Sequence, residues 1–372
     1  MSELMQAAVV HEGADRMSVE EIEIPELGDT DVLVKVMAAG INTGTLFNWR
    51  FLHLSPIMPT ILGIHASGVV ERVGSRVTEF TGGEQVHVDP VIACGRCAAC
   101  AADRRVLCPT NCIIGFATTP GGAGKFEQYH RGAFAQYWKV PERNLHPLAR
   151  NLSFDAGAWF GTLGTSYHGI RMLEPRYGST LVLTGATGAN GVAVIKAAPL
   201  FGIEKVIAIG RTRTVLDEVA KLEPGLVVPL DLASLPDDWE TTGGLTTAIR
   251  DLAGPRGAEG LVDFLPGGHA ATAQALYSLN QGSSASLFGG SREPLILDYV
   301  RTMPVGQYRL QGLKGHAELD VLQLHDYLEA GRIDVEDLVT HRFPLAHIND
   351  AVDLLDNRAG TKTWWIAINP NG

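Results

Sequence analysis

The sequence predicts an α/β protein in which a small, mostly β, barrel-like domain accompanies a parallel sheet flanked by helices. Up to about Arg150, β-branched runs such as Val32–Val36 and Gly68–Val73 lie between Gly, Pro and Asp residues, a pattern typical of short strands. After about Asp155, short apolar strands alternate with helix-compatible segments, which indicates βαβ units and a parallel sheet. A chain of 372 residues is long enough for about two domains.

The individual elements follow from the same patterns. In the first part, the alternating run 132–140 predicts a further strand. The second part predicts strands at 180–183, 205–209, 226–230, 261–264 and 284–288, and helices at 192–198, 214–222 and 270–279. Beyond His316 we expect helices at 319–330 and 348–356, and a final strand at 363–368.

Composition excludes several classes of partner. The formal net charge of −11 disfavours nucleic acid or an anionic membrane. No apolar run reaches the roughly 20 residues needed to span a bilayer, and the amino terminus lacks the basic and apolar segments of a signal peptide. We therefore expect a cytoplasmic protein whose partner is a small-molecule substrate.

A nucleotide-binding turn is predicted where the strand at 180–183 meets a helix. Seven residues, mostly small, form this junction: Gly185, Ala186, Thr187, Gly188, Ala189, Asn190 and Gly191. Small residues permit the tight turn and the close approach of a pyrophosphate, and the helix amino terminus offers free N–H groups. This context favours a nicotinamide cofactor, and a plain tight turn is the alternative.

The next strand indicates which nicotinamide cofactor is bound. It ends at Ile209 and is followed by Gly210, Arg211 and Arg213. NAD sites usually carry an acidic residue here for the ribose hydroxyls, whereas an arginine can pair with a 2′-phosphate. The sequence therefore favours NADP(H), although solvated arginines at a helix start would give the same pattern.

All five cysteines lie in one short stretch. Cys94, Cys97, Cys100 and Cys108 have the close spacing of a metal site, and four thiolates suit a structural Zn²⁺ with no open coordination position. An iron–sulfur cluster is the rival interpretation. Cys112 is left over and is a candidate free thiol.

These features in this order resemble the medium-chain dehydrogenase/reductase superfamily, which includes zinc alcohol dehydrogenases and quinone reductases. The resemblance extends over nearly the whole chain, and its most specific part is the four-cysteine segment. It implies a GroES-like catalytic domain formed by residues 1–157 and 316–372, and a Rossmann NADP-binding domain over residues 158–315. It also implies a homodimer or homotetramer, and a cofactor contact from Thr165.

The resemblance assigns positions for a catalytic zinc, and this chain departs from the pattern at each of them. Asn42 stands where the family has a cysteine, Ile64 where it has a histidine, and Gly161 near the place of the third ligand. His65 occupies the glutamate position of the Gly-His-Glu motif. An amide, an isoleucine and a glycine cannot form an ordinary zinc site. The Gly-Ile-Asn pattern resembles zinc-free quinone and enone reductases instead.

Candidate catalytic residues lie around these positions. Asn42, Thr43 and Thr45 would orient a substrate carbonyl, or they form a turn after a strand. His65 would donate a proton or a hydrogen bond, or it is a structural histidine. Three further residues either line an aromatic substrate pocket or belong to the core: Phe47, Trp49 and His53.

Three functions remain open. The leading hypothesis is an NADPH-dependent reductase without a catalytic zinc, which acts on a carbonyl or on a carbon–carbon double bond conjugated to one, as in an enone or quinone. The second is an alcohol dehydrogenase that interconverts an alcohol and a ketone or aldehyde. A third, from another class, is a nucleotide-binding sensor or structural protein with little catalysis. The segment 115–130, rich in glycine and aromatic residues, is a candidate insertion near the cleft.

Overall fold

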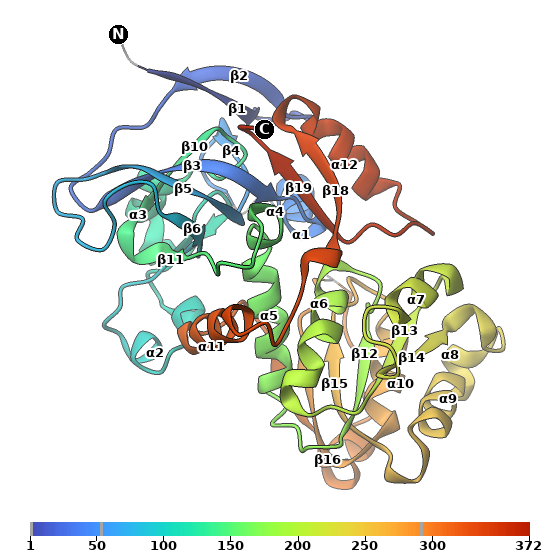
Figure 1. The fold of residues 1–372 in the computed structure, drawn as a ribbon. Helices are drawn as coiled ribbons and strands as arrows, with labels where there is room; N and C mark the ends of the chain where they lie inside the picture. Colours follow the sequence, from blue (N-terminus) through green and yellow to red (C-terminus); the bar gives the residue numbers. More distant parts are fainter. Residues whose placement is uncertain (1–2, 53–54, 291–292) are drawn as a thin grey trace.

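The computed structural model describes residues 3–52, 55–290 and 293–372, so the candidate pocket residue His53 lies outside the described residues. The chain forms a β domain and a second domain built on a parallel sheet (Figure 1). The helix α5 (Phe160–Arg171) leads from the first into the second. The mixed α/β fold predicted from the sequence is confirmed.

The β domain is assembled from both ends of the chain. Its largest sheet has the strand order β11-β6-β5-β3-β19-β18, with β10 paired to β3. Because β19 pairs antiparallel with β3, the carboxyl-terminal strands complete a sheet begun near the amino terminus. These strands are β3 (Asp31–Gly40), β5 (Ala66–Val73), β6 (Gln85–Val88), β10 (Tyr137–Pro141), β11 (Leu145–Pro147), β18 (Val339–Pro344) and β19 (Trp365–Asn369).

Two smaller sheets and several α-helices complete the described part of this domain. One sheet contains β1 (Leu4–Val10), β2 (Ser18–Glu23) and β4 (Thr60–Ile61), and the other contains β7 (Val91–Ile92), β8 (Cys112–Ile113) and β9 (Ala117–Thr118). The helices are α1 (Thr43–Phe47), α2 (Ala98–Ala101), α3 (Ala123–Tyr129), α4 (Phe154–Gly157), α11 (Glu318–Glu329) and α12 (Ile348–Asp356).

The second domain is a Rossmann fold. Its six parallel strands have the order β14-β13-β12-β15-β16-β17. The first of them along the chain, β12, lies inside the sheet, and later strands are added first on one side of it and then on the other, as in dinucleotide-binding sheets. The strands are β12 (Thr180–Thr184), β13 (Lys205–Gly210), β14 (Val227–Asp231), β15 (Ala258–Asp263), β16 (Leu279–Leu287) and β17 (Arg309–Gly312). The helices are α6 (Ala189–Ala197), α7 (Arg213–Ala220), α8 (Trp239–Thr242), α9 (Gly244–Ala253) and α10 (His269–Ser278).

One predicted strand is shorter than expected. The alternation over 132–140 predicts a continuous strand, but β10 begins only at Tyr137. The backbone N–H groups of Gly132, Ala133 and Phe134 instead donate to carbonyls of the segment 61–63. Alternating side chains fit an extended loop that pairs in this way as well as they fit a strand of a sheet. The pattern alone therefore does not show where the strand begins.

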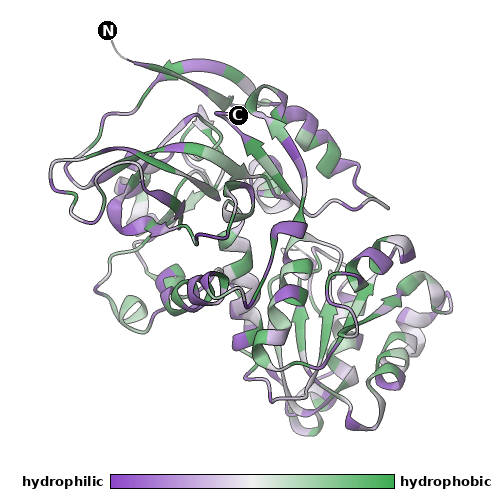
Figure 2. Ribbon diagram, viewed as in Figure 1, coloured by the Kyte–Doolittle hydropathy of each residue, from purple (hydrophilic) through white to green (hydrophobic). Residues whose placement is uncertain are grey.

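The Rossmann sheet is buried on both faces, as its continuous apolar strands require. All five residues of β12 are buried, and Figure 2 shows the central strands in hydrophobic colours while the surrounding helices carry hydrophilic residues as well. No helix among the described residues is long and apolar enough to cross a membrane.

Candidate active site

The glycine turn lies at the carboxyl end of β12, where the strand order of the sheet reverses. Gly185 has φ +67°, a left-handed conformation that favours glycine. A Cβ at Gly191 would lie 2.4 Å from the Gly185 carbonyl oxygen, so only glycine lets α6 pack this close to the strand. Gly188 precedes α6 and provides no side-chain cap. The amino terminus of α6 is therefore suited to a pyrophosphate.

The arginines predicted to bind a 2′-phosphate differ in their surroundings. Arg213 is exposed and its Nε donates to Asp217 Oδ1 over 2.8 Å, so its charge is already paired. Arg211 is exposed at the end of β13 and forms no ion pair with any described residue. Asp231, opposite Gly210 on β14, accepts a hydrogen bond from the Ala233 backbone. Arg211 is thus the better of the two candidates.

A further arginine near this position was missed by the sequence analysis. Arg358, between α12 and β19, is partly buried, and burial together with the nearby charge of Arg211 lowers its pKa. Lys362, four residues later, lies 3.7 Å from Glu218 of α7, so this segment of the β domain runs along the Rossmann domain. No local signal marks Arg358, because more than a hundred residues separate it from Arg211 in the sequence.

The four cysteines predicted to bind zinc come together. Their Sγ atoms all lie within 4.8 Å of one another, and the Cys97–Cys100 and Cys94–Cys100 separations are 3.5 and 3.9 Å. Zinc–sulfur bonds of about 2.3 Å require sulfur–sulfur distances of about 3.8 Å in a tetrahedron. Gly95 turns the chain with φ +73°. The four thiols therefore fit a structural zinc ion.

Cys112 does not belong to this cluster. It is fully buried in β8, and burial raises the pKa of its thiol to about 11. The cysteine is therefore a protonated core residue.

The positions of the family's catalytic zinc do not fit a metal. Asn42 uses Oδ1 to accept a hydrogen bond from the Thr45 backbone N–H over 2.8 Å, which caps α1. A Cβ at Gly161 would lie 2.6 Å from Nδ1 of His65, so the imidazole fills the space that a ligand at residue 161 would need. Within the described ranges, the four cysteines are the only group of three or more such side chains close enough to share an ion.

The predicted catalytic residues surround the end of β3. Asn42, Thr43 and Thr45 lie at the start of α1. The backbone carbonyl of His65 accepts a hydrogen bond of 2.9 Å from the N–H of Gly40, the last residue of β3. Thr45 is almost fully buried, and its Oγ1 has no hydrogen-bond partner among the described residues. Its hydroxyl is therefore available to a ligand.

Two tryptophans connect this group to the glycine turn, and neither was singled out in the sequence. Trp159 and Trp365 stack with their ring centroids 5.6 Å apart at 4°. Trp365 Nε1 donates to the Ala189 carbonyl over 3.1 Å, and the Trp159 ring lies 6.4 Å from that of His65. The start of α6 and His65 are therefore joined through one aromatic stack.

The other residues singled out in the sequence make local contacts. Thr165 lies in α5 and donates its hydroxyl to the Gly161 carbonyl over 2.9 Å. Trp49 is buried in the core of the β domain, and Phe47 packs against Phe51. In the segment 115–130, the Phe116 carbonyl accepts a hydrogen bond from Asn48, so this segment supports the end of α1.

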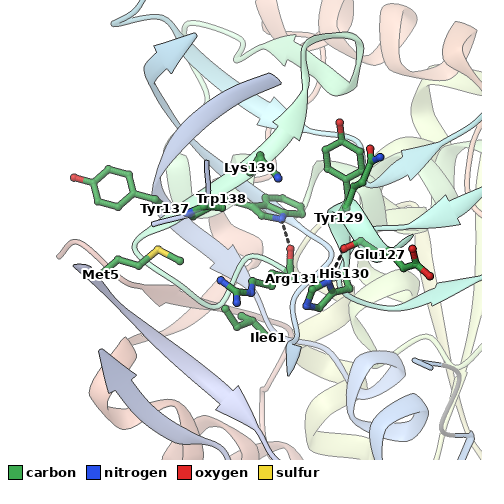
Figure 3. A pocket seen from close by; sticks show the side chains of 12 residues that line it. Met5, Ile61, Glu127, Tyr129, His130, Arg131, Tyr137, Trp138 and Lys139 are labelled. Atoms are coloured by element: carbon green, nitrogen blue, oxygen red, sulfur yellow. Dashed lines mark hydrogen bonds between the residues drawn. The ribbon is translucent and has the colours of Figure 1, made fainter. Parts of the chain in front are cut away.

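A pocket of about 210 Å³ lies elsewhere, on the β domain. Figure 3 shows it between Met5, Ile61 and the strand residues Tyr137 to Lys139, with the Trp138 indole donating to the Arg131 carbonyl. None of the predicted site residues lines it. The pocket is therefore separate from the candidate active site.

Comparison with known proteins identifies the family. The profile of the alcohol dehydrogenase GroES-like domain matches residues 28–150. The chain is 28% identical to L-threonine 3-dehydrogenase of Bacillus subtilis (strain 168) over 357 residues, which cover 94% of this chain and 95% of the relative. It is 30% identical to "Probable D-xylulose reductase A" of Aspergillus fumigatus over 271 residues, covering 70% and 72%.

A solved structure agrees with these relatives. Alcohol dehydrogenase TADH from Thermus sp. ATN1 superimposes with a TM-score of 0.82 at 25% identity, covering 98% of this chain and 99% of that one. The chain therefore belongs to the medium-chain dehydrogenase/reductase superfamily, as predicted, and is an oxidoreductase of that superfamily.

Proposed function

We propose that this oxidoreductase uses NADP(H) and transfers a hydride to or from a carbonyl or a conjugated enone or quinone, without a catalytic zinc. The observation that carries the proposal is the pair Arg211 and Arg358. Each domain contributes one of these arginines, and neither guanidinium has an ion-pair partner among the described residues. Two neighbouring positive charges repel each other, and a dianionic 2′-phosphate would remove that repulsion and accept hydrogen bonds from both.

The remaining residues provide sites for the rest of the cofactor and for the substrate. The turn Gly185–Gly191 and the start of α6 would hold the pyrophosphate. The cofactor supplies the hydride. Thr45 and His65 would donate hydrogen bonds to the substrate oxygen as negative charge develops there. Because the substrate is already an electrophile, this polarisation replaces that of a metal.

The direct test is the affinity of the protein for NADPH and NADH, measured by the fluorescence of the reduced nicotinamide. We expect NADPH to bind more tightly to the wild type. Arg211→Asp and Arg358→Ala should each weaken NADPH binding by about 10–100-fold, because a hydrogen bond to a charged group contributes about 1.5–3 kcal/mol. NADH binding should change by less than about threefold in Arg358→Ala.

Arg256→Ala is the matched control, because it removes an exposed arginine that lies 3.6 Å from Glu204 and away from the glycine turn. It should leave both affinities unchanged. Equal losses of NADPH and NADH affinity in the Arg211 and Arg358 variants would contradict NADP(H) specificity.

An alcohol dehydrogenase activity is the second candidate, and the names of the relatives favour it. The chain aligns over most of its length with dehydrogenases of threonine and of polyols. Oxidation of a secondary alcohol would require a base at the position where His65 and Thr45 meet the substrate. Initial rates with enones, quinones, ketones and secondary alcohols, each with NADP⁺ or NADPH, distinguish the two candidates.

We also propose that the protein forms a homo-oligomer. Strand β17 lies at the edge of the Rossmann sheet, and apolar side chains are exposed just before it: Ile296, Tyr299, Val300, Met303 and Val305. A sheet edge beside exposed apolar groups is a favourable surface for a second copy. Light scattering would give a monomer mass if this proposal is wrong.

A further inference from the structure

Four histidines, each with a buried ring nitrogen, lie where the β domain meets α5. In each of them one ring nitrogen is buried with no hydrogen-bond partner among the described residues: His65 Nδ1, His87 Nε2, His146 Nε2 and His316 Nδ1. A buried polar atom without a partner costs about 1–3 kcal/mol. Four such atoms in one place therefore indicate a function, or water molecules that bridge them.

Two glycines of α5 bring two of these nitrogens onto one face of the helix. A Cβ at Gly161 would lie 2.6 Å from His65 Nδ1, and a Cβ at Gly164 would lie 3.1 Å from His316 Nδ1. Positions three residues apart on a helix have Cβ atoms about 5–6 Å apart. The two imidazoles are therefore neighbours, and one water that donates to one nitrogen and accepts from the other would join them. The absence of side chains at both positions leaves room for both imidazoles.

The other nitrogen of His316 faces a buried carboxylate. His316 Nε2 lies 3.5 Å from Asp89 Oδ2, and Asp89 also pairs with Arg105. Burial opposes protonation of His316, but the hydrogen bond and charge of Asp89 outweigh it and raise the pKa of His316. Burial and the charge of His316 lower the pKa of His65 to about 4. The proton of this pair therefore resides on His316.

Other charged or titratable groups also act on His316 or respond to its charge. Arg105 lies between Cys100 and Cys108, and Asp320 lies in α11. The others are three histidines of the β domain: His65, His87 and His146. Among these, Asp320 already binds His168 and Arg171. Asp89, although it also pairs with Arg105, raises the pKa of His316 more than Asp320 does.

We propose that His316 supplies the proton that completes reduction of the substrate, and that it acts through His65. This inference rests on the proposed function. Hydride adds to the substrate carbon, the carbonyl π electrons move to oxygen, and the resulting enolate or alkoxide takes the proton on Nε2 of neutral His65. In the same step His65 Nδ1 gains a proton, through a bridging water, from Nδ1 of protonated His316, so that His65 stays neutral. His316 becomes neutral beside Asp89 and is reprotonated from solvent, and the proton on His65 returns from Nδ1 to Nε2 before the next turnover.

The test is the pH dependence of kcat for NADPH-dependent reduction in the wild type and in His316→Gln. In the wild type, kcat should fall as the pH rises through the ionisation of His316, because the proton donor is lost. In His316→Gln, kcat should be about 100-fold lower and this alkaline limb should disappear. The NADPH dissociation constant should be unchanged, because His316 does not contact the cofactor turn.

His347→Gln is the control, because His347 is an exposed histidine that lies 2.7 Å from Asp350 on α12. It should retain the wild-type profile. An unchanged alkaline limb in His316→Gln would overturn the relay and leave the proposed function intact. Absence of NADPH turnover in the wild type with any ketone, enone or quinone would overturn both.

A measurement on the wild type alone covers the case in which His316→Gln does not fold. The solvent deuterium isotope effect on kcat, followed across mixtures of H₂O and D₂O, reports how many protons move in the rate-limiting step. A relay through two imidazoles and a water predicts a curved dependence on the deuterium fraction. A linear dependence would indicate a single moving proton and would contradict the relay.

Discussion

Replacing Gly191 by alanine tests the packing that forms the cofactor turn. The new Cβ would lie 2.4 Å from the Gly185 carbonyl oxygen and 2.6 Å from the Ala186 Cα. Both are backbone atoms, so α6 must move away from β12. Such overpacking costs about 1–3 kcal/mol, while the helical preference of alanine over glycine returns about 1 kcal/mol. We expect a net loss of about 1–2 kcal/mol in the free energy of unfolding.

The assay is chemical denaturation of the apo protein, followed by titration with NADPH. Because displacement of α6 also moves the N–H groups that we propose bind the pyrophosphate, the NADPH dissociation constant should rise at least about tenfold, or about 1.4 kcal/mol. Gly124→Ala is the matched control, since no atom lies within 4 Å of its added Cβ in α3, and it should be neutral or slightly stabilising. Equal stability of Gly191→Ala and the wild type would refute the packing argument.

Two further predictions concern contacts within the β domain. The Asp103 carboxylate accepts hydrogen bonds from the N–H groups of Glu318 and Leu319, at 2.7 and 3.0 Å, and so connects the cysteine lobe to the start of α11. Asp103→Ala should lower the free energy of unfolding by about 1–2 kcal/mol, whereas Asp103→Asn, which keeps an acceptor and tolerates the φ of +54°, should lose much less. Similar losses in both variants, measured by denaturant unfolding, would argue against capping. The second prediction is a loss of stability below neutral pH. The pKa of His65 is lowered from 6.5 to about 4 by burial first and by His316 second, so between pH 6.5 and 4 the unfolded chain binds the proton that the folded chain excludes. Stability should therefore fall by up to about 1.4 kcal/mol per pH unit from this residue, and His65→Gln should reduce that slope. An unchanged slope would show that His65 is not the group responsible.

The features predicted correctly from the sequence are those whose residues lie close together in the chain. The Rossmann strands follow from short apolar runs, and the glycine turn lies within seven residues. The four cysteines occupy one loop, so their proximity needed no knowledge of the fold. Helices were also predicted near α7, α11 and α12, where buried positions repeat at helical spacing.

The missed features depend on residues that only the folded chain brings together. Trp159 and Trp365 are about two hundred residues apart, and so are Asp89 and His316. Arg358 has no neighbouring motif, and its nearness to Arg211 depends on the placement of one domain against the other. Gly161 shows the same limit: the sequence shows that a ligand is absent there, but only the structure shows that His65 occupies the space. The start of β10 was misplaced because alternation is common to strands and to loop pairing.

The zinc content of active protein tests most directly whether this oxidoreductase works without a catalytic metal. Mass spectrometry of purified, NADPH-competent protein should give one zinc per chain, and Cys108→Ser should lose that zinc because it removes one of the four thiols within 4.8 Å of one another. Two zinc ions per chain, or one zinc ion retained by Cys108→Ser together with loss of activity on its removal, would contradict a metal-free active site beside His65.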